Sequence, residues 1–175
     1  LSSCASQDPS VICHNANCVE PTDPAQDDTP ASLSASLALR YQDRPVLDGV
    51  EIDLFWRGED DQCIFAHDLL HPKVLVPASE PAAVVAAYFA TPGPIGWHDD
   101  RDFEVLLELK GAVTAPPIKQ HSAAQRVAHA ACAWQTYQTI ANAALAHGRR
   151  IRVTFSSFAP TLLQAVHDAA PTTPA

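Results

Sequence analysis

Residues 49–56 read Gly-Val-Glu-Ile-Asp-Leu-Phe-Trp, and this stretch decides the fold of the chain. Successive side chains of a β-strand point to opposite faces, so the carboxylates of Glu51 and Asp53 share one face. The apolar residues that alternate with them share the other face. The pattern predicts a central strand that packs one face on a hydrophobic core and carries two acids on the other.

The two carboxylates of this strand allow two interpretations. Two like charges held so close together are costly to bury unless a cation or hydrogen-bond donors neutralise them. The pair is therefore either part of a metal site or the solvated face of an antiparallel strand. Taken alone, the alternating pattern favours the solvated strand.

Strands and helices alternate on both sides of this stretch. Apolar periodicity, capping residues and turn residues predict strands at 10–13, 49–56, 63–67, 103–110 and 151–155, and helices at 30–41, 80–90, 122–147 and 160–170. The polar residues 57–62 contain Gly58 and turn the chain back. Regular alternation of strands and helices is typical of an α/β fold with a parallel sheet.

The charge and length of the chain limit its partners and its domain count. The chain has 175 residues, with 11 Lys and Arg against 20 Asp and Glu, and a formal net charge of −9. This balance argues against nucleic acid or an anionic membrane surface as the main electrostatic partner. No run approaches the ~20 apolar residues of a membrane helix. We expect a monomer with one domain at 10–170, a flexible leader at 1–9 and a disordered tail at 171–175.

The cysteines bear on the cellular compartment. Leu-Ser-Ser-Cys at 1–4 resembles the lipobox at which bacterial lipoproteins are cut and acylated. A lipid anchor at Cys4 would attach the protein to a membrane and leave four cysteines that can pair in an oxidising compartment. Cys13 and Cys18 flank His14 closely enough to be bonded to each other. This interpretation predicts a bacterial lipoprotein or secreted protein. The alternative is a chance match and unpaired, buried thiols.

Polar residues collect at the ends of the expected strands, where α/β barrels build their active sites. They are His14, Glu51, Asp53, His67, Glu108 and Lys110. The three carboxylates, with the neighbouring amide of Asn15, form an oxygen-rich set that suits one hard cation, Ca²⁺ or Mg²⁺, rather than zinc. Two histidines beside such a cation can act as general base and general acid on a phosphate ester.

These motifs, in this order, resemble a superfamily of barrel phosphodiesterases. It contains glycerophosphodiester phosphodiesterases, phosphatidylinositol-specific phospholipases C and the sphingomyelinase D enzymes of spider venoms. The matching segments are His14, Glu51-Ile-Asp53, His67-Asp68, Glu108-Leu-Lys110 and the strand end Thr-Phe-Ser-Ser-Phe at 154–158. The resemblance covers most of residues 10–170.

The resemblance implies a (β/α)8 TIM barrel and a metal-dependent phosphoric diester hydrolase. It implies that Glu51, Asp53 and Glu108 bind the cation together with Asn15, that His14 and His67 do the acid–base work, and that Lys110 binds the substrate phosphate. The expected substrate is a small-molecule or lipid phosphodiester. Glycerophosphodiester phosphodiesterases usually carry His-Arg-Gly where this chain has His14-Asn15, so a phospholipid is favoured over a plain glycerophosphodiester.

The length of the chain conflicts with a complete barrel. Eight βα units typically need ~250 residues, so we expect only the first four or five units here. An incomplete barrel leaves a second hypothesis open, a metal- or lipid-binding remnant of the same scaffold without turnover. Taken singly, each site residue also has an ordinary structural explanation: His14 as a packed histidine, for example, or Lys110 as the ion-pair partner of Glu108 on a wet strand.

Overall fold

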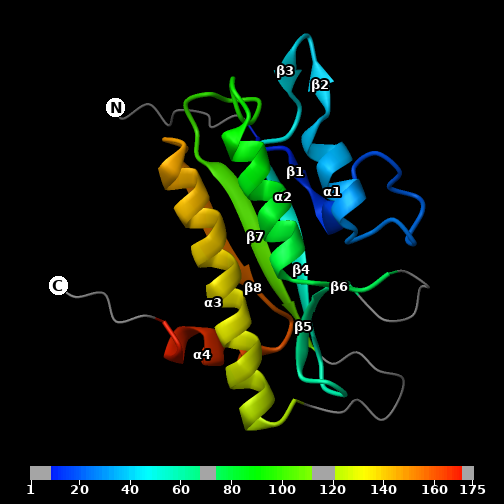
Figure 1. Ribbon diagram of the computed structural model, residues 1–175, viewed down its shortest axis with the longest axis vertical. Helices are drawn as coiled ribbons and strands as arrows, with labels where there is room; N and C mark the ends of the chain where they lie inside the picture. The colour runs from blue at the N-terminus through cyan, green and yellow to red at the C-terminus, as the bar shows by residue number, and fades with distance from the viewer. Residues whose placement is uncertain (1–8, 68–73, 112–120, 171–175) are drawn as a thin grey trace, which may run out of the picture.

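The computed structural model describes residues 9–67, 74–111 and 121–170. In this part of the chain, helices lie against one face of a β-sheet (Figure 1). The α-helices are α1 (Pro30–Leu37), α2 (Ser79–Ala90), α3 (Ala123–Ala146) and α4 (Pro160–Asp168), and a 3-10 turn, η1, spans His14–Ala16. The strands are β1 (Ile12–Cys13), β2 (Arg40–Tyr41), β3 (Arg44–Pro45), β4 (Gly49–Arg57), β5 (Gln62–Phe65), β6 (Val76–Pro77), β7 (Phe103–Lys110) and β8 (Ile151–Ser156).

The sheet is mixed, and β4 lies at its centre. Five of its six strands follow the order β6-β5-β4-β7-β8, and the sixth, β1, pairs in parallel with the first residues of β4. β7 is parallel to β4 and β8 is parallel to β7. β5 and β6 are antiparallel to their neighbours. A tight connection explains the reversal, because residues 58–61 alone join β4 to β5 and a parallel crossover needs a dozen residues or more.

The sheet corrects the expectation of a TIM barrel. In the described residues it is open: β6 lies at one end of the strand order, β8 lies at the other, and the two do not pair. The reversed hairpin of β4 and β5 also breaks the all-parallel pattern that a (β/α)8 barrel requires. The fold is a small, sheet-dominated α/β arrangement with mixed strands and four helices, not a set of barrel units.

The hydrophobic core lies between the sheet and the helices. It contains the even-numbered apolar residues of β4 and the odd-numbered ones of β7, which face the helices; these are Val50, Ile52, Leu54, Val105, Leu107 and Leu109. All four helices contribute apolar side chains to the same cluster. The opposite face of β4 and β7 therefore lacks helical cover, and this is the face that carries the acids.

Close packing fixes the register of the two central strands, β4 and β7, and so decides which side chains of the site lie next to each other. Gly49 pairs with Glu104, and a Cβ atom at Gly49 would lie 2.5 Å from the carbonyl oxygen of Glu104. Any larger residue would push the strands apart at this point. The same register places Asp53 beside Glu108.

Local signals explain most helix boundaries. Ser122 and Gln125 form a capping box at the start of α3, and Gly148 takes a left-handed φ of 62° just after the end of that helix. α1 starts after the Thr29 cap, as expected, but ends at Leu37 rather than near residue 41. The chain there forms the β2–β3 hairpin, whose turn residues both have positive φ.

The described residues contain two disulfides, one that closes a short loop around η1 and one that joins distant elements. Cys13 is bonded to Cys18, the pairing that the sequence suggested, and Cys63 of β5 is bonded to Cys132 of α3. Cys4 lies outside the described residues, so the lipid anchor stays a prediction. None of the described helices is long and apolar enough to cross a membrane.

Candidate metal centre

Three carboxylates converge on the helix-free face of the sheet. Glu51 and Asp53 come from β4 and Glu108 comes from β7, and one oxygen of each lies within 4.8 Å of the others. All three are buried, and Asp53 has no exposed surface. Among the residues that the structure describes, this is the one group of three or more acidic, histidine or cysteine side chains that could hold a metal ion.

Lys110 supplies the nearest positive charge. Its Nζ lies 3.1 Å from Oδ2 of Asp53 and 3.0 Å from Oε1 of Glu108. Burial of the ammonium opposes its charge, but the two carboxylates outweigh this effect and raise the pKa of Lys110. One ammonium cannot neutralise three carboxylates, so the cluster keeps an excess of negative charge in a poorly solvated place.

Asp53 is the most perturbed acid of the cluster. The pKa of its carboxyl is raised from 3.8 to about 7, chiefly by burial; Lys110 opposes this rise, and the charges of Glu51 and Glu108 contribute to it. Desolvation and like charge therefore make the ionised form of Asp53 unfavourable unless a further cation is close. A divalent cation would reverse this balance.

The η1 turn brings two more candidates to the cluster. Nε2 of His14 lies 3.4 Å from Oε2 of Glu51, and the backbone N–H of Asn15 donates a hydrogen bond to the same oxygen at 3.2 Å. The His14 side chain is 75% exposed, so its ring stands between the buried acids and solvent. The parallel pairing of β1 with β4 explains this placement, because it starts η1 beside Glu51.

The Asn15 carboxamide is held from its nitrogen side. Nδ2 of Asn15 donates to Oδ2 of Asp27 at 3.3 Å, while Oδ1 is buried and has no hydrogen-bond partner. Asn15 has a left-handed φ of 51°, which asparagine adopts more readily than most residues. Asp27 was not singled out from the sequence, because it lies in a polar loop with several other acids and no strand or helix period marks it.

His67 follows the short antiparallel strand β5. The backbone N–H of Ala66 donates to the carbonyl oxygen of Asp53, so His67 lies one residue beyond the backbone level of an acid in the cluster. His67 is partly buried. Asp68, the second residue of that motif, lies outside the described residues. The structure thus joins Glu51, Asp53, Glu108, Lys110, His14 and Asn15 by direct contacts.

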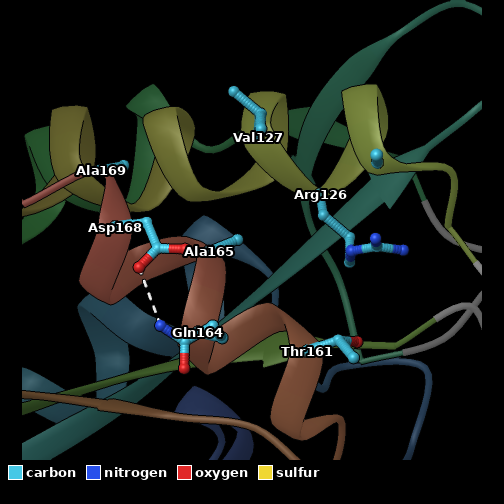
Figure 2. A pocket seen from close by; sticks show the side chains of 8 residues that line it. Arg126, Val127, Thr161, Gln164, Ala165, Asp168 and Ala169 are labelled. Atoms are coloured by element: carbon cyan, nitrogen blue, oxygen red, sulfur yellow. Dashed lines mark hydrogen bonds between the residues drawn. The ribbon is translucent and has the colours of Figure 1, made fainter.

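A groove away from the acidic cluster lies between two helices. A cavity of about 370 Å³ between the start of α3 and α4 is lined by Arg126, Val127, Thr161 and Gln164, among others (Figure 2). The Gln164 amide there donates to Asp168. None of the residues of the acidic cluster lines this groove, and it offers no set of convergent ligands.

The acidic cluster could hold a hard cation. The cluster offers oxygen donors from two adjacent strands, and Oδ1 of Asp53 among them is buried without a hydrogen-bond partner. Such donors match the preference of Ca²⁺ and Mg²⁺. Comparison with models of protein families, with curated proteins and with solved structures found no match.

Proposed function

We propose that this protein is a divalent-cation-dependent phosphoric diester hydrolase. One observation carries the proposal: three buried carboxylates lie within 4.8 Å of one another beside a lysine and an exposed histidine. A structural ion-pair network needs roughly equal charges of each sign, and here the acids outnumber the ammonium. The surplus negative charge is the feature that a catalytic cation would use.

The chain's own groups have complementary tasks in this proposal. The cation would neutralise charge on the phosphoryl oxygens. Lys110 would add a second positive charge for a phosphate that approaches the cluster. His14, exposed and adjacent to Glu51, would accept or donate a proton at the rim, and His67 would serve the opposite side of the phosphorus.

Calorimetry and activity assays test the cation and the reaction together. We expect Ca²⁺ or Mg²⁺ to bind and to raise the melting temperature, because an ion that binds only the folded state stabilises it. Glu108→Gln should abolish this gain. Glu104→Gln is the matched control, since Glu104 lies on the same face of β7 but pairs at 4.0 Å with the exposed Arg152. No gain in the parent protein would refute the proposal.

Turnover should be assayed on a phospholipid and on a water-soluble phosphodiester in parallel. His14→Ala should lower kcat by about 10²–10⁴-fold while cation binding stays nearly intact, because a positioned acid–base group contributes that much. Glu104→Gln is again the control and should keep full activity. Full activity of His14→Ala would show that the assigned role of His14 is wrong.

A second candidate function is cation binding without turnover. The open sheet favours it, because the described strands do not close into a barrel around the acids. Cation-dependent stabilisation of the parent protein, with hydrolysis of neither type of phosphodiester, would make this the better assignment.

A further inference from the structure

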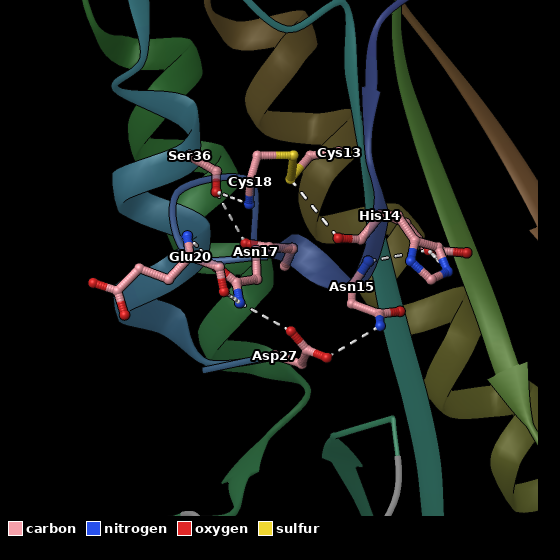
Figure 3. The surroundings of a disulfide bond; sticks show 10 residues. Cys13, His14, Asn15, Asn17, Cys18, Glu20, Asp27 and Ser36 are labelled. Atoms are coloured by element: carbon pink, nitrogen blue, oxygen red, sulfur yellow. Dashed lines mark hydrogen bonds and ion pairs between the residues drawn. A yellow bond between two sulfur atoms is a disulfide. The ribbon is translucent and has the colours of Figure 1, made fainter. Parts of the chain in front are cut away.

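The carboxylate of Asp27 links the loop that precedes α1 to the η1 turn, alongside a backbone hydrogen bond from Asp28 N–H to the carbonyl oxygen of Asn15. Asp27 accepts a hydrogen bond from Nδ2 of Asn15 at 3.3 Å and another from Nδ2 of Asn17 at 2.9 Å. Figure 3 shows the Asp27 carboxylate between the two amide groups, below the Cys13–Cys18 disulfide. Asp27 thus bridges both asparagines of the turn.

Asn17 is the fixed end of this bridge. Its Nδ2 also donates to the backbone carbonyl oxygen of Glu20 at 2.7 Å, and its Oδ1 accepts from the N–H of Glu20. The residue is 4% exposed. Because Asn17 is held on both sides, the position of the Asp27 carboxylate is held too. The remaining oxygen of Asp27 then faces Asn15.

The contact with Asp27 decides which way the Asn15 carboxamide points. A carboxylate only accepts hydrogen bonds, so the amide nitrogen must face Asp27 and the amide oxygen must face away from it. In Figure 3 that oxygen lies on the side of Asn15 away from Asp27. It is buried without a hydrogen-bond partner, while the backbone N–H of the same residue contacts Glu51. A buried oxygen without a hydrogen-bond partner is costly, and a cation bound at Glu51 would give this oxygen a partner.

We propose that Asp27 is a positioning residue, which orients the Asn15 carboxamide so that its oxygen serves as a neutral ligand beside Glu51. The inference rests on the proposed cation site and adds a residue to it from outside the cluster. Such outer partners of metal ligands typically change metal affinity by about 10–100-fold when removed. Asp27 needs no contact with the ion to have this effect.

A double-mutant cycle in the full chain tests the proposal, with Ca²⁺ and Mg²⁺ titrated by calorimetry. We expect Asp27→Asn to weaken cation binding about 10-fold. An Asn side chain at position 27 would turn its own NH2 group towards the NH2 group of Asn15, and two donors cannot form a hydrogen bond. In an Asn15→Ala background the same change should weaken binding less than about 2-fold, since no carboxamide is left to orient. Asp23→Asn, which removes another carboxylate of the same loop, should have less than about 2-fold effect in either background.

The cycle separates positioning from other roles of Asp27. An equal loss of affinity in both backgrounds would mean that Asp27 acts through its charge or through general stability, and would overturn the proposal. Unchanged affinity of Asp27→Asn would overturn it as well, with the cation site intact. If the parent protein binds neither ion, the proposed function fails and this inference fails with it. Should Asp27→Asn not fold, Asp27→Glu keeps the charge, displaces the carboxylate and is judged by the same cycle.

Discussion

At the scale of single residues, Asp53 shows how a group suited to binding a cation can destabilise the fold. Its side chain has no exposed surface and shares its site with Glu51 and Glu108. Among the described residues, Lys110 is the lysine or arginine that contacts this cluster, through Asp53 and Glu108. Such an arrangement destabilises the protein without a cation, and a buried charge of this kind is a frequent mark of a functional site.

Replacing Asp53 by a neutral residue should stabilise the cation-free protein and remove its stabilisation by a cation. We expect Asp53→Asn to raise the free energy of unfolding at pH 8 by about 1–3 kcal/mol without added cation, because a neutral amide avoids the burial of charge. The same variant should lose the cation-dependent rise in melting temperature. Urea unfolding with and without Ca²⁺ measures both effects. A variant that is less stable than the parent in both conditions would show that Asp53 mainly anchors Lys110.

At the scale of elements, the antiparallel hairpin of β4 and β5 depends on its attachment to α3. Trp56 pairs with Cys63 in the hairpin, and Cys63 is bonded to Cys132 on the helix. Nε2 of His129, one turn before Cys132, donates a hydrogen bond at 2.8 Å to the carbonyl oxygen of Leu54. Since that oxygen is an acceptor, Nε2 of His129 carries the proton. The helix therefore holds the second half of β4 at two points.

The two disulfides should differ in their effect on stability. Chain entropy predicts about 4 kcal/mol for the Cys63–Cys132 bond and about 2 kcal/mol for Cys13–Cys18, because the first closes a much longer loop. We expect Cys63→Ala/Cys132→Ala to lower the melting temperature more than Cys13→Ala/Cys18→Ala does. The double variant Cys13→Ala/Cys18→Ala should instead weaken cation binding, since it releases the η1 turn. Scanning calorimetry and cation titration of both double variants separate the two effects; equal loss of stability would contradict the loop-length argument.

At the scale of the whole molecule, stability should depend on pH through the helix–sheet interface. His129 is fully buried, and burial lowers its pKa from 6.5 to about 4, an effect that its hydrogen bond to Leu54 only partly opposes. The unfolded chain therefore binds a proton at this residue more readily than the folded chain does. The contribution of His129 to stability is therefore unchanged above about pH 6.5 and becomes less favourable as the pH drops from there towards 4.

The corresponding prediction concerns acid unfolding. At pH 5 the penalty from His129 should be about 2 kcal/mol relative to pH 7. His129→Phe, which keeps the aromatic packing on Trp56 and removes the titrating group, should show a correspondingly smaller loss between these pH values. His147→Phe is the control, because His147 is exposed at the end of α3. The measurement is urea unfolding at a series of pH values. An unchanged pH profile in His129→Phe would place the acid sensitivity elsewhere.

The order of the main strands and helices, though not the β2–β3 hairpin or β6, could be predicted from the sequence by itself. Periodicity and caps are local properties, so the central strand, the strand at 103–110 and the long helix after Ser122 were located within a few residues. Alternation along a strand places Glu51 with Asp53 on one face for the same local reason. The residues for which a catalytic or ligand role was expected stay predictions in that role.

Only the tertiary structure decided how the strands pair and what surrounds the acids. Whether a sheet closes depends on contacts between residues far apart in the chain, and the short 58–61 turn reversed β5 where an all-parallel barrel was expected. No local pattern in the sequence marks Asp27 or His129 for the part it plays; each is defined by a partner in another element, Asn15 and Leu54. Burial and pairing across the fold turned ordinary polar residues into parts of the site and of the core.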